Sequence, residues 1–160
     1  MPITRVAKFE DLLAFLSESN VPFQVDNAAK VAVLPLNEPP LVGQILIRWE
    51  KQLPYVQILY PLVRDVPAER RGEVEHAICR ANNTISLPGF GYEYSSNFIY
   101  FRLTVPMYEE GMLALSFRRQ VEGVISNSRD FLVPFQQVVA GEPGEKILQL
   151  AVAAAQARKS

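Results

Sequence analysis

The stretch of sequence that decides the fold spans residues 78–106 and reads "ICRANNTISLPGFGYEYSSNFIYFRLTVP". It begins inside a helical pattern, and the apolar face of that helix is formed by Val74, Ala77, Ile78 and Ala81. Asn82 and Asn83 compete for backbone hydrogen bonds, so they favour the end of the helix. Pro88-Gly89 then predicts a turn. The stretch therefore predicts a helix that reverses into extended chain.

Strand-like alternation follows this turn and also precedes the helix. Residues 90–94 and 98–105 predict an antiparallel hairpin, because both runs are rich in aromatic and β-branched side chains. Upstream, runs around residues 30–34, 44–50 and 54–62 predict three more strands. Between the first two of these lies "PLNEPPLVG", which holds three prolines. Because proline cannot donate to a central ladder, we expect this segment at a sheet edge or in a loop.

Helical periodicity marks both ends of the chain. Residues 9–16 carry apolar side chains at helical spacing and predict a first amphipathic helix. A much longer stripe predicts a helix from about Leu113 to Val139 that lies across the sheet, with a kink at Pro134. The stripe consists of Phe117, Val121, Val124, Ser128, Phe131, Phe135 and Val138. A short helix over residues 145–157 follows.

These elements give the order α-β-β-β-α-β-β-α with a short extra C-terminal helix. We expect an α+β fold in which helices pack on one twisted antiparallel sheet. We also expect a single domain over residues 1–160, because 160 residues are an ordinary size for one domain.

Charge and composition exclude several kinds of partner. The net charge is −1 and no basic run is longer than Arg70-Arg71 or Arg118-Arg119, so we expect no nucleic acid as partner. No apolar run approaches the ~20 residues of a membrane span, so we expect no membrane. The N-terminal stretch carries Glu10 and Asp11 where a signal peptide needs an apolar core, so we expect no export signal. With a single cysteine as well, the sequence predicts a cytoplasmic protein.

The sequence offers little for catalysis or for a bound cofactor. Gly89-Phe90-Gly91 precedes a strand rather than opening a helix, so it predicts a turn and not a phosphate site. His76 and Cys79 lie three residues apart on one helix, but two ligands do not complete a metal site. We expect Cys79 to be a small buried hydrophobe. We therefore predict no catalytic residue, no cofactor and no metal.

The aromatic side chains on the predicted strands are the remaining candidates. One layer of helices covers only one face of a sheet, so some of these rings stay exposed on the other face. Alternation places Phe98, Tyr100 and Arg102 on the face opposite to the long helix. Aromatic and arginine side chains are enriched in interface hot spots. We predict a protein-binding face made of these three residues together with Trp49 and Tyr55 on neighbouring strands.

The chain also resembles the YbjN-like family, whose members are named as sensory transduction regulators and whose fold is similar to that of type III secretion chaperones. The resemblance covers roughly Leu41 to Gly141 and rests on residue types at matching spacings, namely Asn82, Asn83, Gly89, Phe90, Tyr100, Arg102, Phe117 and Pro134. It implies an α+β fold and supplies no catalytic residue. The proline-rich segment and the alanine-rich tail depart from the family's pattern.

Three functions stay open at this level. The first is a non-enzymatic protein-binding or regulatory module with a chaperone-like fold. The alternative is a type III secretion-type chaperone, a dimer that binds an effector segment, although a net charge of −1 contrasts with the acidic surface of such chaperones. The third is a small enzyme that uses His76 or Cys79. A homodimer is a further hypothesis, which rests on the resemblance to the chaperone fold and on sheet edges that need cover.

Overall fold

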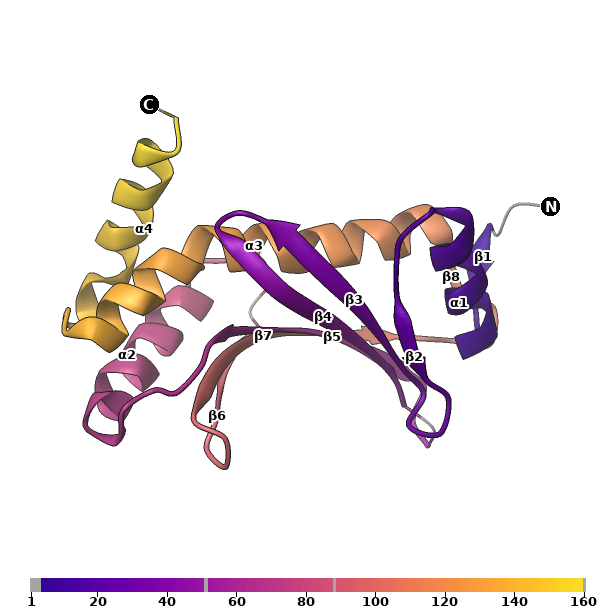
Figure 1. The fold of residues 1–160 in the computed structure, drawn as a ribbon, viewed down its shortest axis with the longest axis horizontal. Helices are drawn as coiled ribbons and strands as arrows, with labels where there is room; N and C mark the ends of the chain where they lie inside the picture. The colour runs from indigo at the N-terminus through magenta and orange to yellow at the C-terminus, as the bar shows by residue number, and fades with distance from the viewer. Residues whose placement is uncertain (1–3, 51, 88, 160) are drawn as a thin grey trace.

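The computed structural model describes residues 4–50, 52–87 and 89–159 and contains a six-stranded antiparallel sheet beneath a long helix (Figure 1). The strands lie in the order β2-β3-β4-β5-β7-β6. Their bounds are Gln24–Asp26 (β2), Val31–Glu38 (β3), Leu41–Trp49 (β4), Tyr55–Val63 (β5), Phe90–Glu93 (β6) and Phe98–Pro106 (β7). The helices are Phe9–Glu18 (α1), Arg71–Asn82 (α2), Ala114–Ala140 (α3) and Ile147–Ala157 (α4). The predicted α+β class and the order of the main elements are confirmed.

Several short elements escape the sequence patterns. β1 (Arg5–Val6) and β8 (Met112–Leu113) pair with each other in a separate two-stranded sheet. β2 pairs with the first residues of β3. Strands of two or three residues are too short to show alternation, so the sequence does not reveal them. Single turns of 3₁₀ helix, Ala68–Arg70 (η1) and Gly144–Lys146 (η2), lead into α2 and α4.

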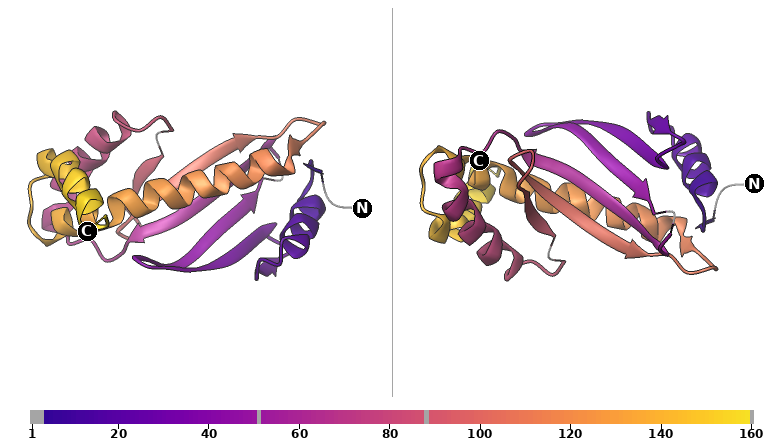
Figure 2. Two further views of the ribbon diagram at one scale, coloured as in Figure 1. Left: turned by 90° about the horizontal axis from the view of Figure 1, so that it is seen from above. Right: turned by 90° about the horizontal axis from the view of Figure 1, so that it is seen from below.

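The core lies between α3 and the sheet (Figures 1 and 2). Phe117, Val124 and Phe135 of the predicted α3 stripe are fully buried. The inner face of β5 is buried at each of its predicted positions, which are Val56, Ile58, Tyr60 and Leu62. α3 remains one continuous helix through Pro134. The apolar side of α3 and the apolar side of β5 therefore face each other and form one core layer.

The proline-rich segment forms the end of a hairpin at the side of the sheet. β3 continues to Glu38 and β4 begins at Leu41, so Pro39 and Pro40 occupy the turn between them. Pro35 belongs to β3 but lies beyond the residues that pair with β2. An edge position suits proline because its missing N–H then costs no ladder bond. The expected edge or loop is confirmed.

Asn82 fixes the path from α2 into β6. Its Oδ1 accepts hydrogen bonds from the backbone N–H groups of Gly89 and Phe90 at 3.1 and 2.9 Å, and its Nδ2 donates to the Phe90 carbonyl at 2.9 Å. A Cβ at Gly89 would overlap the carbonyl oxygen of Arg102, so only glycine fits there. Pro88 of the predicted turn lies outside the described residues. The Gly-Phe-Gly sequence thus joins a helix to a strand.

A bulge in β5 bends the sheet away from α3. The register between β5 and β7 shifts between Pro61 and Val63. A bulge bends its strand and increases the local twist. Figure 1 shows the sheet arching downward, with the β6–β7 hairpin and the β2–β3 turn hanging at opposite ends. The face opposite α3 is therefore concave, and no helix of the described residues covers it (Figure 2, right).

Candidate protein-binding face

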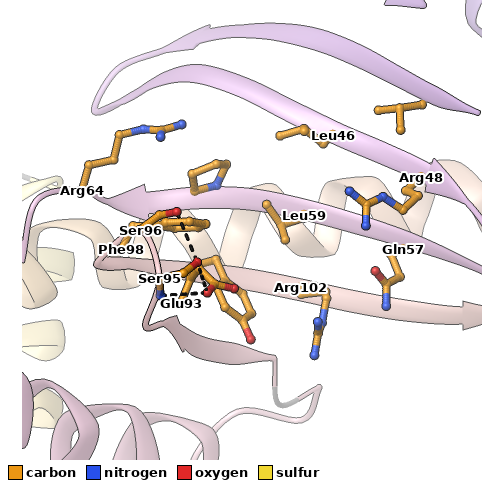
Figure 3. Close-up of a pocket in the computed structure, with 13 residues that line it drawn as sticks. Leu46, Arg48, Gln57, Leu59, Arg64, Glu93, Ser95, Ser96, Phe98 and Arg102 are labelled. Carbon is orange, nitrogen blue, oxygen red and sulfur yellow. Dashed lines mark hydrogen bonds between the residues drawn. The ribbon is translucent and has the colours of Figure 1, made fainter. Parts of the chain in front are cut away.

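The concave face of the sheet holds a depression of about 450 Å³ (Figure 3). Side chains from β4, β5, β7 and the β6–β7 turn provide most of its lining. We name this surface the open sheet face, and its residues are Val31, Leu46, Arg48, Gln57, Leu59, Pro61, Arg64, Glu93, Ser95, Ser96, Phe98, Tyr100 and Arg102. Apolar side chains lie near the middle, and arginines lie around them.

Strand register decides which side chains meet on this face. Residues directly opposite each other in antiparallel strands point to the same side of the sheet. Arg102 of β7 pairs with Leu59 of β5, and Leu59 pairs in turn with Leu46 of β4. Two residues further along β5, Gln57 pairs with Arg48. The open sheet face therefore has an apolar row across its middle, with a guanidinium group at one end and a second arginine beside it.

Arginines lie over both aromatic rings of the open sheet face. The Arg64 guanidinium lies 5.7 Å from the centre of the Phe98 ring, and the Arg102 guanidinium lies 5.3 Å from the centre of the Tyr100 ring. These are cation–π distances. The Tyr100 ring also covers Gly91 of β6, where a Cβ would overlap it. The two rings therefore support and orient the arginines.

Arg71 of α2 contacts the β6–β7 hairpin, which carries Phe98, and holds it against the helix. Its guanidinium lies 5.7 and 5.6 Å from the ring centres of Tyr92 and Tyr94, and it donates to Asn97 Oδ1 at 3.1 Å. Asn97 has a positive φ of 49°, a conformation that asparagine adopts more readily than most residues. The Tyr92 hydroxyl donates to the same oxygen at 3.0 Å. The rim of the open sheet face is thereby held against a helix.

The open sheet face carries an excess of positive charge. Arg48, Arg64 and Arg102 are exposed, and none of them forms an ion pair with another residue in the described ranges. Among the residues that line the depression, Glu93 is the only carboxylate. Hydrogen bonds from the Ser95 hydroxyl, at 2.8 Å, and then from the Ser95 N–H, at 3.1 Å, lower the pKa of Glu93. Glu93 is therefore ionised but already engaged within its own turn.

The structure brings four of the five predicted binding residues to this side of the sheet. Phe98, Tyr100 and Arg102 line the depression directly. Tyr55 alternates with the buried Val56 of β5, so its side chain points to the same side. Tyr55 begins β5, at the far end of the strand, and does not line the depression.

Trp49 lies on the opposite side of the sheet. Its cross-strand partner is the fully buried Val56, and Trp49 packs half-buried against the core. Alternation with the buried Ile45 and Ile47 already places Trp49 on the core side. The expected grouping of Trp49 with the open sheet face therefore does not hold. The β4 residue that contributes there is Arg48.

The sequence did not predict Arg48, Gln57, Leu59 and Arg64 as binding residues, although alternation along β5 places Gln57 and Leu59 on the same side as Tyr55. The signal for Arg48 is present, because its neighbours in β4 point inward and it must then point outward. Arg64 has no such signal. It follows the last residue of β5 and reaches Phe98 only because the bulged strand turns there.

His76 and Cys79 do not form a site. Both side chains are exposed on α2, so the expectation of a buried Cys79 is wrong. The buried stripe of α2 passes through Val74, Ala77 and Ala81, which leaves Cys79 on the outer side. Within residues 4–50, 52–87 and 89–159, no three His, Cys, Asp or Glu side chains gather closely enough to hold a metal ion. In the same ranges, no helix combines the length with the hydropathy that crossing a membrane requires.

A second groove, of about 220 Å³, lies between α1, β3 and α3. Most of its lining is apolar and includes Phe15, Val21, Leu34, Val121 and Ile125. Arg118 of α3 lies at its rim, where the guanidinium is 5.9 Å from the centre of the Phe15 ring and donates to Ser19 Oγ at 3.3 Å. This groove is apolar, whereas the open sheet face is cationic.

Comparison with known proteins shows the fold. No protein-family model matches the chain, and no curated protein matches it. Among solved structures, YbjN from E. coli, a candidate transcription regulator, superposes with a TM-score of 0.56 at 10% identity, over 78% of this chain and 88% of that chain. A chain of the HopA1–SchA chaperone–effector complex superposes with a TM-score of 0.52 at 14% identity, over 78% and 93% of the two chains. The YbjN-like fold that the sequence resemblance implies is therefore confirmed.

Proposed function

We propose that this protein is a non-enzymatic module that binds a protein partner, or regulates one, through the open sheet face. One observation carries the proposal: exposed arginines lie beside half-buried aromatic rings on a concave sheet surface that no helix of the described residues covers. Arginine and aromatic residues contribute most of the binding energy at many protein interfaces. Phe98, Tyr100 and Arg102 form the central part of the contact, and Tyr55 extends it along β5.

The chemistry of the open sheet face supports binding rather than catalysis. General acid–base catalysis needs a titratable group that points at a substrate atom. Glu93 is held by Ser95, and the residues that line the depression include no histidine or cysteine. His76 and Cys79 are exposed on α2 and do not line the depression. These placements weigh against the small enzyme that the sequence left open.

The similar folds support a binding role by analogy. YbjN is a candidate transcription regulator, and the HopA1–SchA pair is a complex of a chaperone with an effector. A fold hosts many functions, so the analogy supports the class of function and not the identity of the partner. We therefore propose a binding module on that basis, and we keep the cytoplasm as the location that the sequence predicts.

A second candidate function is a chaperone-type homodimer that binds an effector segment. The groove between α1, β3 and α3 favours it, because apolar grooves receive the apolar side chains of a bound segment. A dimer would also cover a free edge of the sheet, at β6 or along the end of β3. Light scattering at low micromolar concentration tests this point. A mass twice the 18.0 kDa of the chain is expected, and a species of 18.0 kDa would contradict it.

Photo-crosslinking in the native cell separates the two functions. Benzoylphenylalanine is placed at Arg102 on the open sheet face, at Glu122 beside the apolar groove, or at the exposed Arg80 of α2 as a control. We expect a crosslinked protein from position 102 and none from position 80. A crosslink from position 122 without one from position 102 would favour the chaperone-type function. Equal products from positions 80 and 102 would contradict the proposed face.

A further inference from the structure

We propose that the open sheet face recognises an extended acidic segment of its protein partner. This inference rests on the proposed function of that face and specifies the chemistry of the partner. Arg48, Arg64 and Arg102 are exposed and form no ion pair in the described ranges, whereas the single lining carboxylate, Glu93, is bound to Ser95. A protein with net charge −1 thus concentrates positive charge on one concave surface. Interfaces pair opposite potentials, so the complementary partner is negative.

The spacing of the arginines suits an extended segment and not one small anion. Arg48 lies on β4 and Arg102 lies on β7, with β5 between them. Neighbouring strands are about 4.8 Å apart, so these two backbone positions are separated by about 10 Å across the sheet. Arg64 lies beyond the other end of β5, beside Phe98.

Leu59 and Gln57 of β5 separate Arg48 from Arg102, so the space between the arginines is partly apolar. Leu46 lies beside Leu59 on β4, and Pro61 lies on the way to Arg64 (Figure 3). A guanidinium group binds one carboxylate in a two-bond fork. A segment whose acidic residues alternate with apolar ones would therefore match the charged and the apolar parts of the face together.

The same rings are poorly placed to stack on nucleic acid bases. Proteins that bind single strands stack bases on open aromatic faces. Here Arg64 lies over Phe98, Arg102 lies over Tyr100, and the Tyr100 ring rests on Gly91. The rings instead restrain the guanidinium groups, so these groups lose less freedom when a carboxylate binds. The arrangement favours an acidic peptide over nucleic acid.

Selection from a random peptide library tests the inference. A displayed library of peptides of about 12 residues, long enough to cross the sheet when extended, is selected on the immobilised full-length protein. We expect enrichment of peptides in which Asp and Glu are separated by apolar residues. Synthetic copies should bind a variant that carries both Arg48→Gln and Arg102→Gln at least about tenfold more weakly, because the charge-assisted contacts are lost. Arg80→Gln removes an exposed arginine of α2 and should leave binding unchanged.

Each other outcome overturns a defined part of the proposal. Peptides that lose binding to the double variant but hold no excess of Asp and Glu overturn the acidic inference and leave the proposed function standing. No enrichment, or binding that the double variant does not weaken, overturns both. A labelled single-stranded oligonucleotide is measured beside the peptides by fluorescence anisotropy. If the oligonucleotide binds the wild-type protein more tightly than the selected peptides do, and the double variant no longer binds the oligonucleotide, then the face recognises nucleic acid and the inference fails. Thermal unfolding confirms that each variant is folded.

Discussion

The Tyr100 ring of β7 lies directly against Gly91 of β6, its partner across the two strands. A Cβ at position 91 would overlap three atoms of the ring, Cζ, Oη and Cε2, so no larger residue fits while the ring keeps this place. Glycine in a strand interior costs stability, and close approach of another group is a common reason for its presence. The pair therefore sets the position of Tyr100, and with it that of Arg102, on the open sheet face.

The first prediction concerns Gly91→Ala, which should displace the Tyr100 ring. The atoms in the way belong to the far end of the half-buried Tyr100 side chain, which can shift, so the substitution should lower the unfolding free energy by at most about 1 kcal/mol, measured by urea denaturation. In a Tyr100→Ala background the ring is gone, so the same substitution should cost much less. An equal cost in both backgrounds would show that the ring does not require glycine.

Gly123→Ala in α3 is the matched control for that substitution. No atom lies within 4 Å of a Cβ built there, and the site is in a helix interior. Alanine should stabilise such a site by up to about 1 kcal/mol.

A second prediction concerns Asn82, whose side chain makes three hydrogen bonds to the start of β6. Asn82→Ala leaves the N–H groups of Gly89 and Phe90 without this acceptor. We expect a loss of about 2–3 kcal/mol, since each unsatisfied and partly buried donor costs about 1–3 kcal/mol. Asn83→Ala is the control, because Asn83 is exposed and no side-chain hydrogen bond is described for it. Similar losses in the two variants would contradict the assigned role of Asn82.

A third prediction concerns Phe131 of α3, which is buried with its ring centre 5.0 Å from that of Phe90 and 6.2 Å from that of Phe135. Phe131→Ala should lower the unfolding free energy by about 3–5 kcal/mol, because it leaves a cavity among these rings. Leu115→Ala on the same helix removes a side chain that is 60% exposed. It should change stability by no more than about 0.5 kcal/mol. A loss below that size for Phe131→Ala would mean that the stripe does not face the core.

A fourth prediction links Tyr60 to alkaline pH. Burial raises the pKa of Tyr60 above its ordinary value of 10.0. The Tyr60 hydroxyl also donates to the Val42 carbonyl at 3.2 Å, a hydrogen bond that only the protonated form can make. The folded protein therefore keeps this proton at a pH where the unfolded chain releases it. The contribution to stability is complete below the unfolded pKa and is lost as the pH rises through the folded pKa.

Denaturant titrations at a series of pH values measure this effect. The wild-type protein should lose stability above the ordinary tyrosine pKa more steeply than Tyr60→Phe does. At neutral pH, Tyr60→Phe should lower the unfolding free energy by only about 0.5–1.5 kcal/mol, which is what one hydrogen bond usually contributes. Parallel pH curves for the two proteins would show that Tyr60 is not the group responsible.

Sequence periodicity was sufficient to predict the layers of this fold. The α3 stripe and the inner face of β5 are buried as expected, because spacings of 3.6 and 2 residues follow from local backbone geometry alone. The end of α2 at Asn82 was also predictable, since asparagine competes for backbone bonds at helix ends. The hydrogen bonds of Asn82 to Gly89 and Phe90 were not, because they depend on the path of the turn between them.

What the sequence by itself determined is which residues form helices and strands and which side of each strand is apolar. Only the tertiary structure decided which strands are neighbours, and so which outward side chains meet. β7 lies beside β5, which brings Arg102 next to Leu59 and onto the same depression as Arg48. The orientation of α2 against its neighbours places Cys79 on the solvent-facing side of the helix, where it is exposed. Strand order and helix orientation arise from contacts between segments that are distant in the sequence, and a local periodicity contains no information about those contacts.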